Sequence, residues 1–108
     1  MASVSQDEIE KHLLFLQNGS PGEKFTAVKF FELQIDVLYE NLLPISFVSD
    51  STIRETIAWL LGKSTIQDIQ IIECLIRLSE DIDRNVRMKA IISLDEIEAR
   101  LSRASSSN

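Results

Sequence analysis

The feature that most constrains this chain is a segment that occurs twice. Residues 81–101, DIDRNVRMKAIISLDEIEARL, have a weaker copy in residues 50–62, DSTIRETIAWLLG, when Asp83 is aligned with Asp50. The copies agree in kind at five positions, Asp83/Asp50, Val86/Ile53, Arg87/Arg54, Ala90/Ile57 and Leu94/Leu61. The separation of Asp50 from Asp83 along the chain falls in the range of roughly 20–50 residues that is typical of repeat arrays. In arrays of helix pairs, each pair buries its apolar face only by stacking on its neighbours. The repeat therefore predicts a stacked helical array rather than an enzyme.

Length and cysteine content limit the class of protein further. With 108 residues we expect one domain, able to bury about two thirds of the surface of its unfolded chain without metal or disulfides. The single cysteine, Cys74, cannot form an internal disulfide, and no Cys/His cluster indicates zinc. The N-terminal residues do not have the pattern of a signal peptide, and no apolar stretch has the length of a membrane span. We therefore expect a soluble, cytoplasmic protein.

The charge of the chain bears on its partners. Seventeen acidic and 11 basic side chains give a net charge of −6, and the basic residues are scattered along the sequence. Such a chain repels a phosphate backbone, so nucleic acid is not the expected partner.

Helical periodicity and turn residues predict six helices. The first two are expected at about 6–17 and 23–33, and the third begins at about 35 and is kinked or ended by Pro44. The fourth opens with a capping box at Thr52 and ends at Gly62. The fifth is expected at 65–79, and the sixth runs from the turn at 80–83 to about Leu101. The chain is thus predicted to be all-α, a single domain over residues 1–108 arranged as a short α-solenoid of about three antiparallel helix pairs. The tail from about residue 102 is expected to be disordered.

The repeated pattern resembles the second helix of HEAT and HEAT-like repeats. Val86-Arg87, Ala90 and Leu94 carry the match, with Asp83 in the preceding turn, and a faint third copy places Lys24, Ala27 and Phe31 at the Arg, Ala and Leu positions. The spacing from this faint copy to the middle one, and from the middle one to the last, is shorter than the roughly forty residues of ordinary HEAT units. It resembles the compact variant in phycobilisome-lyase-type HEAT-like proteins.

The resemblance implies structural roles for four charged residues. Asp and Arg at these positions in HEAT-like arrays commonly bond between adjacent repeats. The resemblance therefore implies a pair between Asp50 and Arg87, and a bond from Arg54 back toward the turn of the first repeat. Asp83 lies in the turn before the last copy. The alternative is that each is a solvated surface charge, worth under about 1 kcal/mol. Arg100 is expected to be such a surface charge.

Four apolar residues are candidates for binding a partner. Trp59 projects about 145° from the apolar face of its helix, and it is either buried against the adjacent repeat or an exposed anchor. Met88, Ile91 and Ile92 lie off the core stripe of the last helix, where no further repeat is expected to cover them. We therefore expect another protein as partner, with a homodimer as a further possibility.

No residue pattern indicates catalysis, a cofactor or a metal. His12 has no neighbouring nucleophile and is expected at the surface, and Cys74 is expected to be a partly buried, inert thiol. In the fifth helix Ile69 and Ile76 are expected in the core stripe with four other residues. The first functional hypothesis is therefore a HEAT-like protein-binding module that acts as an adaptor or small regulator. The second is a lyase or chaperone for a bilin adduct, which only the compact-repeat resemblance suggests. The third is a structural homo-oligomer.

Overall fold

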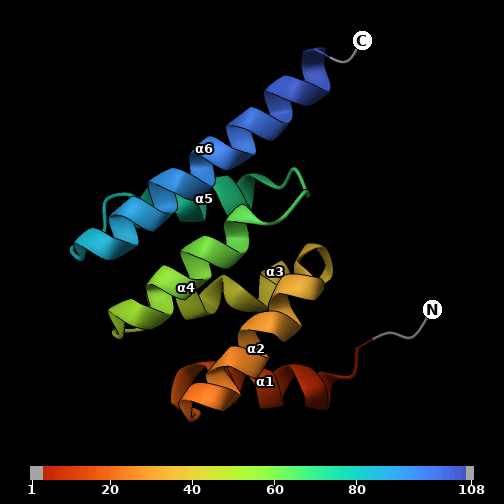
Figure 1. The fold of residues 1–108 in the computed structure, drawn as a ribbon, viewed down its shortest axis with the longest axis vertical. Coiled ribbons are helices and arrows are strands. Elements are labelled where there is room, and N and C mark those ends of the chain that lie inside the picture. Colours follow the sequence, from red (N-terminus) through yellow and green to blue (C-terminus); the bar gives the residue numbers. More distant parts are fainter. Residues whose placement is uncertain (1–3, 107–108) are drawn as a thin grey trace.

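The computed structural model describes residues 4–106, and over that range the chain is helical without any strand, which confirms the predicted all-α class (Figure 1). The elements are α1 (Gln6–Asn18), α2 (Pro21–Leu33), α3 (Ile35–Leu42), the short 3-10 helix η1 (Pro44–Phe47), α4 (Ser51–Gly62), α5 (Ile69–Leu78) and α6 (Arg84–Ser106). Pro44 ends α3 and opens η1, as its missing N–H and fixed φ require.

The helices form a flat body two helices thick. Helices α2, α4 and α6 succeed one another along the long axis, and α5 lies behind α6 (Figure 1). Helix α1 packs on α2, α4 packs on α6, and α5 also packs on α6. The shortest dimension of the body is 21 Å, which matches two helix diameters of about 10–12 Å each.

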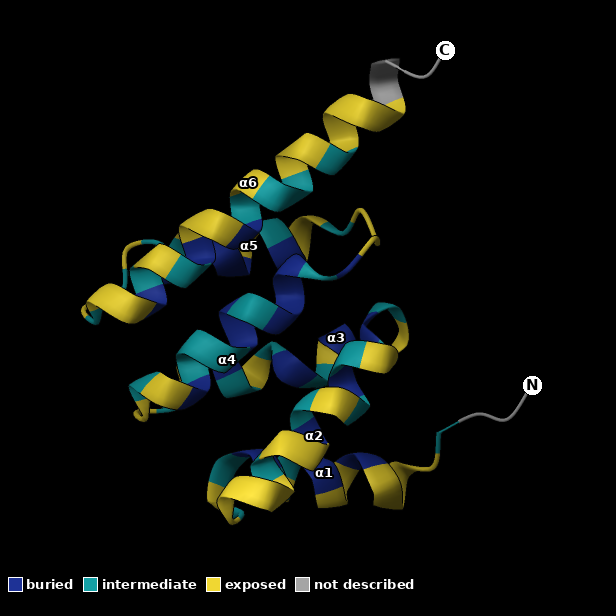
Figure 2. Cartoon of the chain, viewed as in Figure 1, coloured by how far each residue is buried: buried dark blue, intermediate teal, exposed yellow. Residues whose placement is uncertain are grey.

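The core runs through the contacts between these helices (Figure 2). Its fully buried members come from α2 to α6, and include Phe31, Leu42, Ile57, Leu60, Leu61, Leu75, Leu78, Val86 and Ala90. In α6 the fully buried positions end at Ser93, and the residues from Leu94 to Ala104 are half-buried or exposed. The second half of α6 therefore extends beyond the core.

Helices α2, α4 and α6 begin with equivalent caps. The side chain of Ser20 accepts a hydrogen bond from Glu23 N, that of Asp50 from Thr52 N, and that of Asp83 from Asn85 N and Val86 N. The three caps occupy the same position in the three aligned copies, so the aligned positions are true helix starts. The predicted capping box at Thr52 is wrong, because Asp50 is the cap, its side chain accepts from Thr52 N, and Thr52 lies inside the helix.

The start of α5 differs clearly from the one expected. Helix α5 begins at Ile69 rather than at residue 65, because Asp68 is its cap. The shorter helix buries Ile71, Cys74, Leu75 and Leu78, and it leaves Ile69 and Ile76 exposed rather than in the core stripe.

At the C-terminal end, α6 continues past Leu101 to Ser106. The tail that was expected to be disordered from about residue 102 is thus helical as far as the structure describes it. No glycine or proline interrupts the residues after Leu101.

Candidate functional site

The two repeated arginines close the turns before their own helices in the same way. In each case Nη1 donates to the carbonyl oxygens five and six residues earlier in the chain. For Arg54 these are the carbonyls of Ser49 and Val48, at 2.8 and 2.9 Å, and for Arg87 those of Ile82 and Asp81, at 3.0 and 2.9 Å. The sequence repeat is therefore also a repeat of local structure.

Arg54 also makes the bond between the two copies. Its Nε and Nη2 donate to the two carboxylate oxygens of Asp81, both at 2.8 Å, and the two side chains are only 12% and 10% exposed. The hydrogen bonds from Arg54 lower the pKa of Asp81, and the hydrogen bond to Asp81 raises the pKa of Arg54. This bidentate pair fastens α4 to the turn that leads into α6.

The predicted pair of Asp50 with Arg87 does not form. Asp50 caps α4, Asp83 caps α6, and Arg87 bonds to the turn before its own helix. Arg54 does not reach back to the first turn of the array: it bonds to the turn before its own helix and holds Asp81, which lies later in the chain. Asp81 was missed because Val48 occupies its aligned position in the first copy, so the pairing leaves no mark in the repeat.

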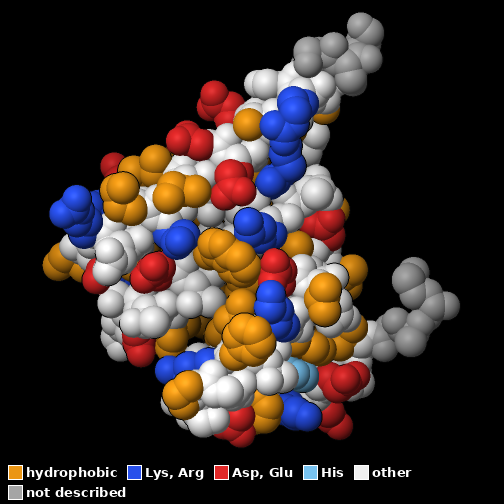
Figure 3. All heavy atoms as spheres, viewed as in Figure 1, with side chains coloured by type: hydrophobic (Ala, Val, Ile, Leu, Met, Phe, Trp, Pro, Cys, Tyr) orange, Lys and Arg blue, Asp and Glu red, His pale blue; other side chains and the backbone are white. Residues whose placement is uncertain are grey.

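The first half of α6 presents large apolar side chains to solvent. Met88, Ile91 and Ile92 are 49%, 45% and 47% exposed. Their spacing of three and four residues places them on one side of the helix, and we call this set the α6 flank. Figure 3 shows hydrophobic side chains gathered over this part of the molecule. The structure thus places all three at the surface, where a partner can reach them.

Trp59 is half-buried and packs against the core. Nζ of Lys63 lies 4.9 Å from the centroid of its ring and 3.7 Å from a carboxylate oxygen of Glu96. Trp59 also lines a hollow of about 390 Å³ between α2, α4 and α6, together with Val28 and Lys89. Neither of the two expectations for Trp59 holds in full, because neighbours cover part of the ring and the hollow reaches another part.

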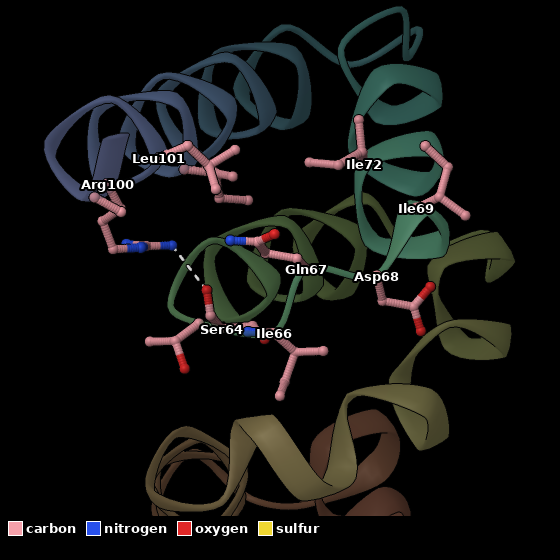
Figure 4. A pocket seen from close by; sticks show the side chains of 11 residues that line it. Ser64, Ile66, Gln67, Asp68, Ile69, Ile72, Arg100 and Leu101 are labelled. Atoms are coloured by element: carbon pink, nitrogen blue, oxygen red, sulfur yellow. Dashed lines mark hydrogen bonds between the residues drawn. The ribbon is translucent and has the colours of Figure 1, made fainter. Parts of the chain in front are cut away.

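A groove of about 430 Å³ lies between the second half of α6, the start of α5 and the linker of residues 64–68 (Figure 4). Arg100 closes one side, donating through Nη2 to the carbonyls of Gly62 at 2.6 Å and Ser64 at 2.8 Å. Arg100 is therefore not the free surface charge that the sequence suggested. The groove was not predicted, because residues 65–68 read as part of a helix.

Helix α3 holds this linker through hydrogen bonds to two carboxylates, Asp36 in α3 and Asp68 in the linker. Asp36 accepts from Ser64 Oγ at 2.8 Å, from Thr65 N at 2.7 Å and from the Thr65 hydroxyl, and Tyr39 donates its hydroxyl to Asp68. Burial raises the pKa of Asp36, but the bonds from Thr65 and Ser64 outweigh it and lower that pKa overall. The linker is therefore clamped outside α5.

We call these bonds between α3 and residues 64–68 the clamp. The bond from Tyr39 to Asp68 makes the stability of the fold depend on pH in the alkaline range. The hydrogen bond to Asp68, followed by burial and the charge of Asp68, raises the pKa of Tyr39 from 10.0 to about 12. Above pH 10 the phenol of the unfolded chain ionises while that of the folded chain stays neutral, so stability is expected to fall as the pH rises from 10 toward 12. Denaturant unfolding across this range measures the loss.

The chain has a single tyrosine, so the ultraviolet absorbance of tyrosinate reports on Tyr39 alone. The folded protein is expected to titrate well above 10.0, and Tyr39→Phe to lose less stability than the wild type between pH 10 and 12. Titration of the folded protein at the ordinary tyrosine pKa would contradict the clamp.

His12 is buried, and its predicted surface position is wrong. Its ring stacks on Phe30 with centroids 3.7 Å apart, and Nδ1 lies 2.7 Å from Glu8 O. His12 shares the face of α1 that contains Ile9 and Leu16 and packs on α2. Its role is therefore in packing.

Cys74 is buried in α5, and its Sγ lies 3.6 Å from Nη2 of Arg77. Within the part of the chain that the structure describes, no group of three or more His, Cys, Asp or Glu side chains is arranged to hold a metal ion.

Comparison with protein-family models, with characterised proteins and with solved structures gives no match. Among residues 4–106, no helix has both the length and the apolar character needed to span a membrane.

Proposed function

We propose that this chain is a protein-binding module, an adaptor or small regulator built as a HEAT-like α-solenoid of about three helix pairs. The observation that carries the proposal is the α6 flank, where Met88, Ile91 and Ile92 are each nearly half exposed on one side of one helix. A contiguous exposed apolar patch on a small domain usually marks an interaction site. A partner helix that lays its own apolar face on the flank is the occupant best suited to such a surface.

Local structure supports the repeat architecture. The caps of α2, α4 and α6 recur at the same place in the aligned copies, and the two arginines bond to equivalent carbonyls. The bond from Arg54 to Asp81 connects one unit to the next, as stacking of units requires. A fold made this way offers extended surfaces for partners rather than an enclosed catalytic site.

The bilin lyase or chaperone hypothesis finds less support. Such a role needs a pocket with a convergent acid or thiol. The groove beside residues 64–68 contains one acid, Asp68, which Tyr39 already engages. Cys74 and Glu73 line a separate hollow of about 350 Å³, where the buried thiol lies 3.6 Å from Nη2 of Arg77. We therefore favour protein binding and treat the homo-oligomer as an outcome of the test.

The test is the double variant Met88→Lys with Ile92→Glu. Both side chains are about half exposed, so helicity and melting temperature are expected to stay nearly unchanged. Binding of the co-purifying partner, or a dimer seen by sedimentation if the chain associates with itself, is expected to be lost. Affinity capture from a lysate of the source organism and analytical ultracentrifugation measure these two results.

The matched control is Val37→Lys with Ile76→Glu, which places the same charges on two other exposed apolar positions. It is expected to keep both fold and partner. If the α6 variant unfolds, or if both variants lose the partner equally, the flank is not the binding surface and Trp59 becomes the next candidate.

A further inference from the structure

Helix α4 has a face that receives the next unit of the fold. It consists of Arg54, Ala58 and Gly62, which are spaced by four residues and lie on one side of the helix. Ala58 O accepts a hydrogen bond of 2.7 Å from Ser93 Oγ, and Gly62 approaches Ser93 so closely that a Cβ there would lie 3.0 Å from Ser93 Cα. Arg54 completes the face through its bidentate bond to Asp81.

Helix α6 carries the same face one repeat later. The equivalent residues are Arg87, Ile91 and Asp95. Unlike the face on α4, this one is open, since Ile91 is 45% exposed and Asp95 is exposed, whereas Ala58 and Gly62 are buried. Helix α6 thus repeats the face of α4, and no helix covers that face among residues 4–106.

Arg87 shows which group a partner on this face should supply. Its Nη1 is anchored by the carbonyls of Asp81 and Ile82, as Nη1 of Arg54 is anchored by its own turn. Its Nε and Nη2 have no hydrogen-bond partner among the residues described. In Arg54 that same edge holds a carboxylate at 2.8 Å. The planar guanidinium is therefore held in place with the edge that fits a carboxylate open.

We propose that Arg87 binds an Asp or Glu carboxylate of a partner protein, placed in the turn that precedes a partner helix packed along Ile91. This inference rests on the proposed function and specifies the partner's chemistry. The carboxylate would stand to Arg87 as Asp81 stands to Arg54, and the helix would stand to Ile91 as α6 stands to Ala58. Ile91 and Asp95 are larger than Ala58 and Gly62, so the partner helix lies farther out than α6 lies from α4.

A second copy of this chain does not supply the required group by stacking head to tail. Asp81 lies just before the cap Asp83, and the matching positions before the caps Asp50 and Ser20 are Val48 and Asn18. Asn18 offers one acceptor oxygen, an NH₂ that is itself a donor, and no charge, so it cannot form the charged pair on two oxygens that Asp81 forms with Arg54. The partner is therefore a different protein with an acidic turn.

The probe for this site is a synthetic peptide with the sequence of residues 79–101, which supplies the carboxylate of Asp81 in the turn before a helix. NMR of the labelled full chain follows the Nε–H of Arg87 and the methyl groups of Ile91. The peptide is expected to shift both signals, and an Asp81→Asn peptide to bind about tenfold more weakly because the bidentate charged pair is lost. The peptide substitution leaves the fold of the protein untouched.

The matching change on the protein is Arg87→Lys, which keeps the charge and removes the fork. It is expected to reduce the preference for the Asp peptide over the Asn peptide, because the charge attraction remains and the two-bond fork is lost. Equal affinity for the two peptides, no binding, or shifts at Arg54 Nε–H instead of Arg87 would overturn the proposal. So would self-association of the chain without peptide that Ile91→Glu removes, since the occupant would then be a second copy.

The outcome is separable from that of the proposed function. If Met88→Lys with Ile92→Glu loses the natural partner while Arg87→Lys keeps it at full affinity, protein binding through the α6 flank stands and the carboxylate contact fails. If neither variant affects the partner, both fail.

Discussion

Gly62→Ala is expected to destabilise the fold by about 2–3 kcal/mol, because the added methyl group overpacks a contact that cannot relax easily. A Cβ at this position would lie 2.6 Å from Ser93 Cβ and 3.0 Å from Ser93 Cα, so backbone as well as side chain must move. The higher helix propensity of alanine, about 1 kcal/mol, opposes this effect without cancelling it. Denaturant unfolding measures the difference, and thermal unfolding is expected to show a melting temperature about 10 °C lower.

The matched control is Gly22→Ala. Gly22 lies in the first turn of α2 and nothing is within 4 Å of a Cβ added there, so the same substitution is expected to be neutral or to stabilise by about 0.5 kcal/mol. Ser93→Gly in the background of Gly62→Ala removes the closest atoms and should recover part of the loss, although its bond to Ala58 is lost too. If Gly62→Ala is as well tolerated as Gly22→Ala, α4 and α6 are not packed this closely.

Arg54→Ala is expected to cost about 2–3 kcal/mol, since it leaves the mostly buried carboxylate of Asp81 without its partner and two turn carbonyls without a donor. Arg87→Ala should cost less, because Arg87 makes only the bonds to its own turn. Exposed Arg84 provides a control that should be near neutral. Chemical denaturation of the three variants gives the order, and equal, negligible effects would show that the bond from Arg54 to Asp81 does not support the fold.

The cost of Arg54→Ala is also expected to depend on pH. Because the pKa of Asp81 is lowered in the folded chain, the pair stabilises the fold fully above the ordinary carboxyl pKa of 3.8 and loses this effect as the pH falls through the lower folded value. The difference between wild type and Arg54→Ala should therefore be constant near neutral pH and shrink in acid. A difference that stays constant into strong acid would contradict the charged pair.

Local features of the fold could be predicted from the sequence. Helix ends depend on a few neighbouring residues, so Pro44 marked the end of α3 closely. The recurrence of Asp50 and Asp83 before apolar residues at helical spacing marked the two turns that α4 and α6 follow, and both residues cap these helices. The same periodicity separated Met88, Ile91 and Ile92 from the core stripe of α6, and the structure places all three at the surface.

Contacts between segments that lie far apart in the sequence could not be predicted, because they depend on how the helices approach each other. Asp81 pairs with Arg54 although the repeat contains no second copy of that acid, and Asp36 and Tyr39 hold residues 64–68 outside α5 despite their helical pattern. His12 is buried because α2 covers its side of α1.

Composition and periodicity therefore determined that this chain is all-α and where most of its helices begin. They also determined which apolar residues of α6 lie outside the core. Tertiary structure alone decided which carboxylate each arginine meets, and so left the Nε edge of Arg87 open while that of Arg54 is filled. The reason is physical: a helix start is stabilised within one turn of chain, whereas a bidentate ion pair requires two separate segments to be held within hydrogen-bonding distance by the packing of the whole fold.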